Sequence, residues 1–228
     1  MMIVASNWPP YTPAEVPPML ADDLKSILEP LYVATLELHR TVYRYELLAA
    51  LGRNWDFVQR IKGTTAAPPL NTIKGCINTA IVVSLCAFFD EAVSGVNLKT
   101  VLNCVLRPEY AMGFRQFHAS TNPGFDVDRQ LARLRRMQRR LRRGNTGRAI
   151  ERLSGLRNQM VAHLDVRPEF AKGYPVMADM GTVLAGVANI VVSLVRLVIP
   201  GRPVVPALGR RDARRQALAL ALAIHPIP

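Results

Sequence analysis

Arg157, Asn158 and His163 are the residues of this chain whose types and spacing suggest chemistry. A histidine that titrates near neutral pH can move a proton, and an arginine can hold two oxygens of a phosphate. RNA carries its own nucleophile, the 2′-hydroxyl group, so its cleavage needs only proton transfer and stabilisation of the charge that develops on the phosphate. The three residues therefore predict a site that cleaves RNA without a metal ion or another cofactor.

The spacing of apolar residues predicts that these residues end a helix. Arg157 falls within the apolar stripe of this helix, and a buried guanidinium needs a carboxylate partner or an anionic ligand. From a candidate N-cap at Thr146, apolar residues recur at intervals typical of one helix face: Ile150, Leu153, Met160, Val161 and Leu164.

One copy of this helix does not bring Arg157 and His163 together. His163 is six positions after Arg157, so an ideal helix turns it roughly 120° away and raises it by about 9 Å. Both side chains reach one substrate atom only if the last turn unwinds or if a second copy of the helix faces the first. A symmetric homodimer would provide that second copy and would place Arg157 of one subunit near His163 of the other.

The order Arg157-Asn158, three variable residues, Ala162-His163 resembles the RNxxxAH signature of the HEPN superfamily. These all-helical proteins occur in bacterial toxin-antitoxin and abortive-infection systems, and active members are dimeric, metal-independent endoribonucleases. The resemblance implies that activity here, with Arg157, Asn158 and His163 as the catalytic site and a cognate antitoxin as a possible partner. In the abortive-infection branch, a long helix ending in an acidic residue precedes the motif, which residues 88–91 would match.

The same residues also have a structural interpretation. Arg157 would pair with Asp90, Glu151 or another carboxylate, and His163 would be a cation favoured by the dipole at a helix C-terminus. The protein would then be a non-catalytic, helical RNA-binding or partner-binding module with a degenerate HEPN motif. An open basic cleft that contains both Arg157 and His163 favours the enzyme, whereas either side chain sealed in the core against a carboxylate favours the binding module.

The net charge of +12 suits a polyanionic partner. The chain has 24 arginines and five lysines, which indicates a compositional bias, so the charge is supporting information only. Residues 126–143 combine a narrow apolar stripe with a broad arginine face, which predicts either a helix that binds RNA phosphates or a solvated surface. The predicted RNA-binding residues are Arg135, Arg136, Arg139, Arg140 and Arg143.

Three further patterns predict a cytoplasmic protein that does not contact a membrane. Residues 1–18 lack the basic start and apolar core of a signal peptide. The longest uncharged runs, 75–89 and 180–195, are shorter than the roughly 20 residues of a membrane-spanning helix. The three cysteines form no CxxC pair, and we expect them to be reduced thiols in the core.

The long apolar segments predict an all-α, single-domain bundle of about five or six helices that dimerises through the motif helix. The bundle covers residues 19–200, between a Pro-rich N-terminal arm (1–18) and a basic, Ala/Leu-rich C-terminal tail (201–228). Residues 19–51 should form a helix that Pro30 kinks or divides, and 63–69 should form a linker. The most apolar segment, 71–93, is expected at the centre. Further helices are predicted at 98–106, 108–118, 126–143 and 173–199.

Overall fold

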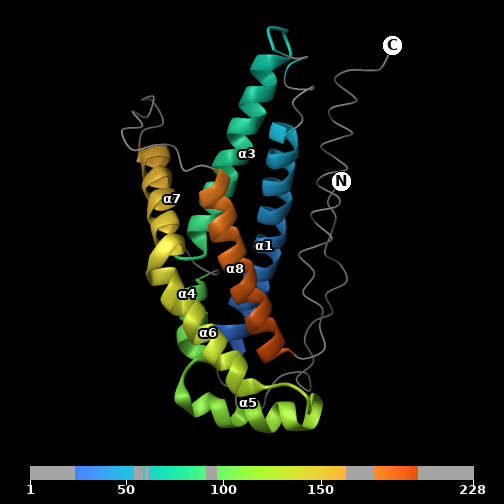
Figure 1. The fold of residues 1–228 in the computed structure, drawn as a ribbon, viewed down its shortest axis with the longest axis vertical. Helices are drawn as coiled ribbons and strands as arrows, with labels where there is room; N and C mark the ends of the chain where they lie inside the picture. The colour runs from blue at the N-terminus through green and yellow to red at the C-terminus, as the bar shows by residue number, and fades with distance from the viewer. Residues whose placement is uncertain (1–23, 54–58, 60–61, 91–96, 163–176, 200–228) are drawn as a thin grey trace, which may run out of the picture.

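The chain folds into a single bundle of α-helices in a computed structural model that describes residues 24–53, 59, 62–90, 97–162 and 177–199. These residues form seven helices and no strand, which confirms the predicted all-α class (Figure 1). The count exceeds the predicted five or six, although the two short helices α4 and α5 lie where separate helices were predicted, at 98–106 and 108–118. The helices are α1 (Leu24–Arg53), α3 (Ala67–Ala87), α4 (Leu98–Val105), α5 (Pro108–Thr121), α6 (Val127–Arg142), α7 (Gly144–Ala162) and α8 (Met177–Val198).

Two predicted boundaries were wrong for identifiable reasons, and one of the two alternatives at Pro30 is excluded. Pro30 was predicted to kink or divide its helix; it does not divide α1, which continues through it from Leu24 to Arg53. Pro68 and Pro69 belong to the first turn of α3 and not to a linker, because proline fits the first helical positions. Thr146 is not the N-cap of the motif helix, because α7 already begins at Gly144. The predicted terminal arm and tail, 1–18 and 201–228, lie outside the described residues.

The central helix is α8, and not the predicted segment 71–93. α8 packs against α1, α3, α6 and α7 and buries more than half of its residues. α3 and α8 have 21 and 22 residues and are long and apolar enough to cross a membrane by length and composition alone. α3 begins before the uncharged run 75–89 and includes Lys74, and α8 extends beyond the uncharged run 180–195 and includes Arg196. Of the most apolar 18-residue stretch of each helix, 56% is buried inside the bundle in α8 and 33% in α3.

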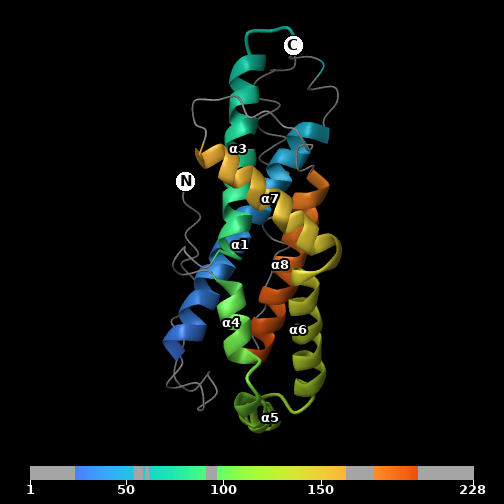
Figure 2. The same ribbon diagram turned by 90° about the vertical axis from the view of Figure 1, so that its left-hand side faces the viewer.

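α5 lies across one end of the bundle, below α6 and α8 (Figures 1 and 2). The side chain of Phe114 is fully buried there. His118 is in the last turn of α5 and is 1% exposed, so its side chain is enclosed by the protein. Its Nε2 lies 2.8 Å from the carbonyl oxygen of Leu197, its ring stacks on Phe125, and burial lowers its pKa. His118 therefore joins α5 to the end of α8.

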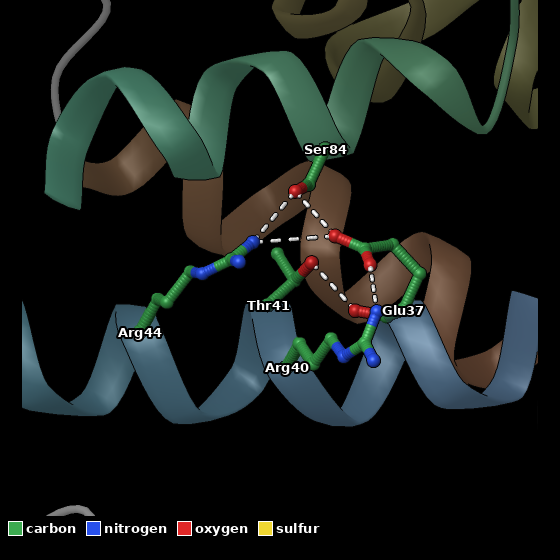
Figure 3. A network of polar contacts seen from close by, with 5 residues as sticks. All are labelled: Glu37, Arg40, Thr41, Arg44 and Ser84. Atoms are coloured by element: carbon green, nitrogen blue, oxygen red, sulfur yellow. Dashed lines mark hydrogen bonds and ion pairs between the residues drawn. The ribbon is translucent and has the colours of Figure 1, made fainter. Parts of the chain in front are cut away.

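A polar network crosses the interface between α1 and α3 (Figure 3). The Ser84 hydroxyl donates to Glu37 Oε1 at 2.5 Å, and Arg44 donates to both Ser84 Oγ and Glu37 Oε1 at 3.0 and 3.2 Å. Glu37 also lies 3.6 Å from Arg40. These contacts satisfy a carboxylate at an otherwise apolar helix contact, as a partly buried charge requires.

The connection between α6 and α7 depends on Gly144, whose φ of 76° is in the left-handed region. We expect Gly144→Ala to lower the free energy of unfolding by about 1–2 kcal/mol, because L-residues with a Cβ are strained in this conformation. Urea denaturation of the purified variant measures the change. Gly75→Ala is the matched control, since Gly75 is an exposed residue inside α3 and alanine there should stabilise by up to about 1 kcal/mol. Equal stability of Gly144→Ala and the wild type would contradict the prediction.

Candidate functional site

Arg157 lies at the edge of the buried side of α7. Ala149, Leu153 and Leu156 form the centre of that side and are almost fully buried. Arg157 follows Leu156 by one residue, which rotates it by about 100° around the helix. Its side chain is 24% exposed. The predicted apolar stripe was therefore slightly misplaced, and Arg157 is partly buried at its border.

Asp90 and Asn158 hold the guanidinium of Arg157. Asp90, three residues beyond the end of α3, forms an ion pair with Nη1. Oδ1 of Asn158 accepts hydrogen bonds from Nε and Nη2 of Arg157 at 3.2 and 3.0 Å. Arginine has five N–H groups, and these contacts engage three of them. Asn158 therefore orients the arginine, a role that its adjacent position in the sequence did not suggest.

A buried thiol lies on the same α3–α7 interface. The Cys86 Sγ is 3.9 Å from the Ser154 hydroxyl oxygen. Cys86 lies four residues before Asp90, and Ser154 lies three residues before Arg157. Burial raises the pKa of the Cys86 thiol, while the hydrogen bond between Cys86 and Ser154 and the charge of Arg157 act in the opposite direction. Cys86 is 3% exposed. Its raised pKa and its burial make it a core residue and not a nucleophile, as the sequence predicted for this cysteine; Cys76, by contrast, is exposed.

His163, the third of the predicted catalytic residues, lies outside the described residues. The predicted dimer involves a second copy of the chain, and the structure describes one copy. Arg157 fulfils one condition of the structural interpretation, because it has a carboxylate partner. It does not fulfil the other condition, because it is partly exposed and is not sealed in the core. Among the residues with described positions, no three His, Cys, Asp or Glu side chains gather as candidate metal ligands.

The arginine helix was predicted correctly: α6 runs from Val127 to Arg142, and the Asp126 carboxylate caps it by accepting from the Arg129 N–H at 2.8 Å. A groove of about 670 Å³ lies between α6, α8 and the turn at 124–126. Two of the predicted RNA-binding residues, Arg136 and Arg140, line it. The other three are exposed outside it: Arg135, Arg139 and Arg143.

Arg129 and Arg133 also line the groove; both belong to the arginine face predicted for residues 126–143, although they were not among the five residues singled out for RNA binding. The signal was present in the sequence as the intervals of four, three and four residues that place Arg129, Arg133, Arg136 and Arg140 on one arc of a helix. We call these four residues the groove arginines.

Arg157 and the groove lie at different heights along the bundle. α7 rises by about 20 Å between Gly144 and Arg157, and α6 extends in the other direction from Gly144 (Figure 1). A strand of RNA that touches both sites would therefore have to follow α6 and α7 along much of their combined length.

The chain matches no protein-family model, no curated protein and no solved structure. The resemblance to the HEPN superfamily therefore rests on the sequence motif at 157–163 alone.

Proposed function

We propose that this chain is a cytoplasmic, metal-independent endoribonuclease of a bacterial toxin-antitoxin or abortive-infection system. It would act as a homodimer through the motif helix, without a cofactor or membrane contact. Arg157 and His163 would be catalytic residues, and Asn158 would orient Arg157. The observation that carries the proposal is the position of Arg157, which is partly exposed, held on two sides by Asp90 and Asn158, and part of a motif of defined spacing.

The arrangement around Arg157 suits a group that stabilises negative charge. Asp90 and Asn158 fix the direction of the guanidinium before a substrate arrives, so that little reorganisation is needed during the reaction. One N–H on each terminal nitrogen is not engaged by these two residues. Two such N–H groups can contact two oxygens of one phosphate, which is the geometry for which arginine is better suited than lysine.

The reaction would begin with removal of a proton from the 2′-hydroxyl group of RNA. The 2′-oxygen then bonds to the adjacent phosphorus while the bond from phosphorus to the 5′-oxygen breaks. His163 would accept the proton of the 2′-hydroxyl group and, once protonated, would return a proton to the departing 5′-oxygen, directly or through a water molecule, while Arg157 stabilises the additional charge on the phosphate oxygens. The products are a 2′,3′-cyclic phosphate and a free 5′-hydroxyl group.

The second candidate function is RNA or partner binding without cleavage. The ion pair between Arg157 and Asp90 favours it, because the pair gives Arg157 a role in joining α7 to α3 that requires no substrate. In that case the motif is degenerate, and the exposed arginines of α6 provide the affinity for RNA.

We expect the purified full-length protein to cleave a mixed RNA pool in the presence of EDTA and to leave 2′,3′-cyclic phosphate ends. The expectation follows from a mechanism that uses only the 2′-hydroxyl group and protein side chains. Sequencing of the fragments, with and without enzymatic removal of the cyclic phosphate, identifies the ends. DNA of the same sequence is the control, since it lacks the nucleophile. Cleavage of both polymers, or loss of activity in EDTA, would contradict the proposed mechanism.

A further inference from the structure

The groove arginines form an uninterrupted row of positive charge along one wall. In an ideal helix, residues 129, 133, 136 and 140 fall within an arc of about 60° and span about 16 Å along the axis. Successive members are thus separated by roughly 4.5–6 Å along the axis, a step similar to that between neighbouring phosphates of an extended nucleic-acid strand. The row is therefore matched to a linear polyanion more closely than to a single small anion.

The groove arginines lack the carboxylate partners that other arginines of this protein have. Arg115 pairs with Asp128, Arg152 with Asp179, and Arg157 with Asp90. None of the groove arginines forms an ion pair within the described part of the chain. Their charges therefore repel one another, and no ion pair within the described residues neutralises them.

The opposite wall of the groove does not compensate this charge. α8 contributes the exposed amide of Asn189, and the only acidic residue of α8, Asp179, is paired with Arg152. Asp126 lies at one end of the groove, where its carboxylate caps α6. Phe125 and Met137 contribute apolar surface between the polar walls. The groove thus combines a cationic wall, neutral hydrogen-bonding groups and an apolar part, a combination that suits the backbone and bases of a nucleic acid.

We propose that the groove between α6 and α8 binds the phosphate backbone of single-stranded RNA through the groove arginines. The identification of RNA as the strand rests on the function proposed above, whereas the phosphate site rests on the groove alone. The site differs from the predicted RNA-binding surface, because Arg135 and Arg139 point to another side of α6 and Arg129 and Arg133 take their place.

The test compares two double variants with the same loss of charge on the same helix. Arg133→Gln/Arg136→Gln removes the middle of the groove row, and Arg135→Gln/Arg139→Gln removes two exposed arginines outside the groove. Fluorescence polarisation measures Kd for a labelled single-stranded RNA with 2′-O-methyl groups, which cannot be cleaved through its 2′-oxygen. Circular dichroism verifies that both variants are folded.

We expect the groove variant to bind at least tenfold more weakly and the outer variant to bind less than threefold more weakly. The slope of log Kd against log salt concentration should become smaller by about 1.4 in the groove variant, since each phosphate contact with a single strand contributes about 0.7. Equal losses in the two variants, or no loss in either, would overturn the proposal.

Two competitors identify the ligand chemistry. Single-stranded DNA of the same sequence should compete at the groove if the backbone phosphates are recognised, and weaker competition by DNA would add recognition of the 2′-position. Polyglutamate that competes as well as RNA would overturn the proposal in favour of an acidic protein partner. RNA binding that depends on the groove, together with the absence of cleavage, would leave this site intact and contradict only the endoribonuclease function.

Discussion

Replacing His163 with alanine is expected to reduce RNA cleavage by about 10²–10⁴-fold, because positioned general acid–base groups contribute rate factors of that size. Binding of the uncleavable RNA should change less than threefold, since the groove arginines lie on α6. Initial rates of cleavage and fluorescence polarisation measure the two effects separately.

The control for this prediction is His39→Gln, which removes a histidine from α1, where burial lowers the histidine pKa. It should leave cleavage unchanged. If His163→Ala and the wild type cleave RNA at the same rate, the activity belongs to another site or to a contaminant, and the motif is not catalytic.

Replacing Arg157 with alanine is expected to reduce cleavage by about 10²–10³-fold, the usual effect of removing one group that stabilises transition-state charge. Arg157→Lys should not restore the rate, because an ammonium group lacks the planar pair of donors that Asn158 and Asp90 orient. Asp90→Asn should reduce cleavage by less than tenfold, because it leaves the arginine in place. Initial rates at equal concentrations of folded protein measure these effects.

The matched control is Arg152→Ala on the same helix, which removes an arginine that pairs with Asp179. Both arginine variants lose an ion pair, and Arg152→Ala also leaves the nearly buried carboxylate of Asp179 without its partner. Arg152→Ala should therefore lower the free energy of unfolding at least as much as Arg157→Ala does. Only Arg157→Ala should lower the cleavage rate. A similar loss of stability in the two variants with no loss of cleavage in either would establish Arg157 as a structural residue.

The sequence predicted the helices of this bundle well, because long amphipathic segments carry a strong periodic signal. The arginine helix is the clearest case: apolar residues at 127, 131 and 134 are buried, and Asp126 caps the helix. The predicted boundaries were weaker at Pro30, Pro68 and Pro69, where proline was interpreted as a break. Pro68 and Pro69 lie in the first turn of α3, where proline is tolerated, whereas Pro30 lies inside α1 without interrupting it.

The candidate site was predictable only in part. The position of Arg157 on a partly buried helix edge implied a carboxylate partner, and Asp90 was one of the candidates. The choice among the carboxylates was not predictable, because it depends on how α3 packs against α7. The groove had the same limitation: the row of arginines is a local pattern on α6, but the neutral wall that faces it belongs to α8, about 50 residues later in the chain.

The network of Glu37, Arg44 and Ser84 has a consequence for Asp90. Sliding α3 along α1 by one turn would break the hydrogen bonds that join Ser84 to Glu37 and Arg44, whereas the ion pair between Glu37 and Arg44 lies within α1 and would remain. The apolar contacts between the two helices tolerate such a shift more readily, so the polar network fixes the position of α3 along α1. Since Asp90 follows Ser84 by only six residues, a contact on the α1 side of α3 sets the height at which Asp90 meets Arg157 on α7.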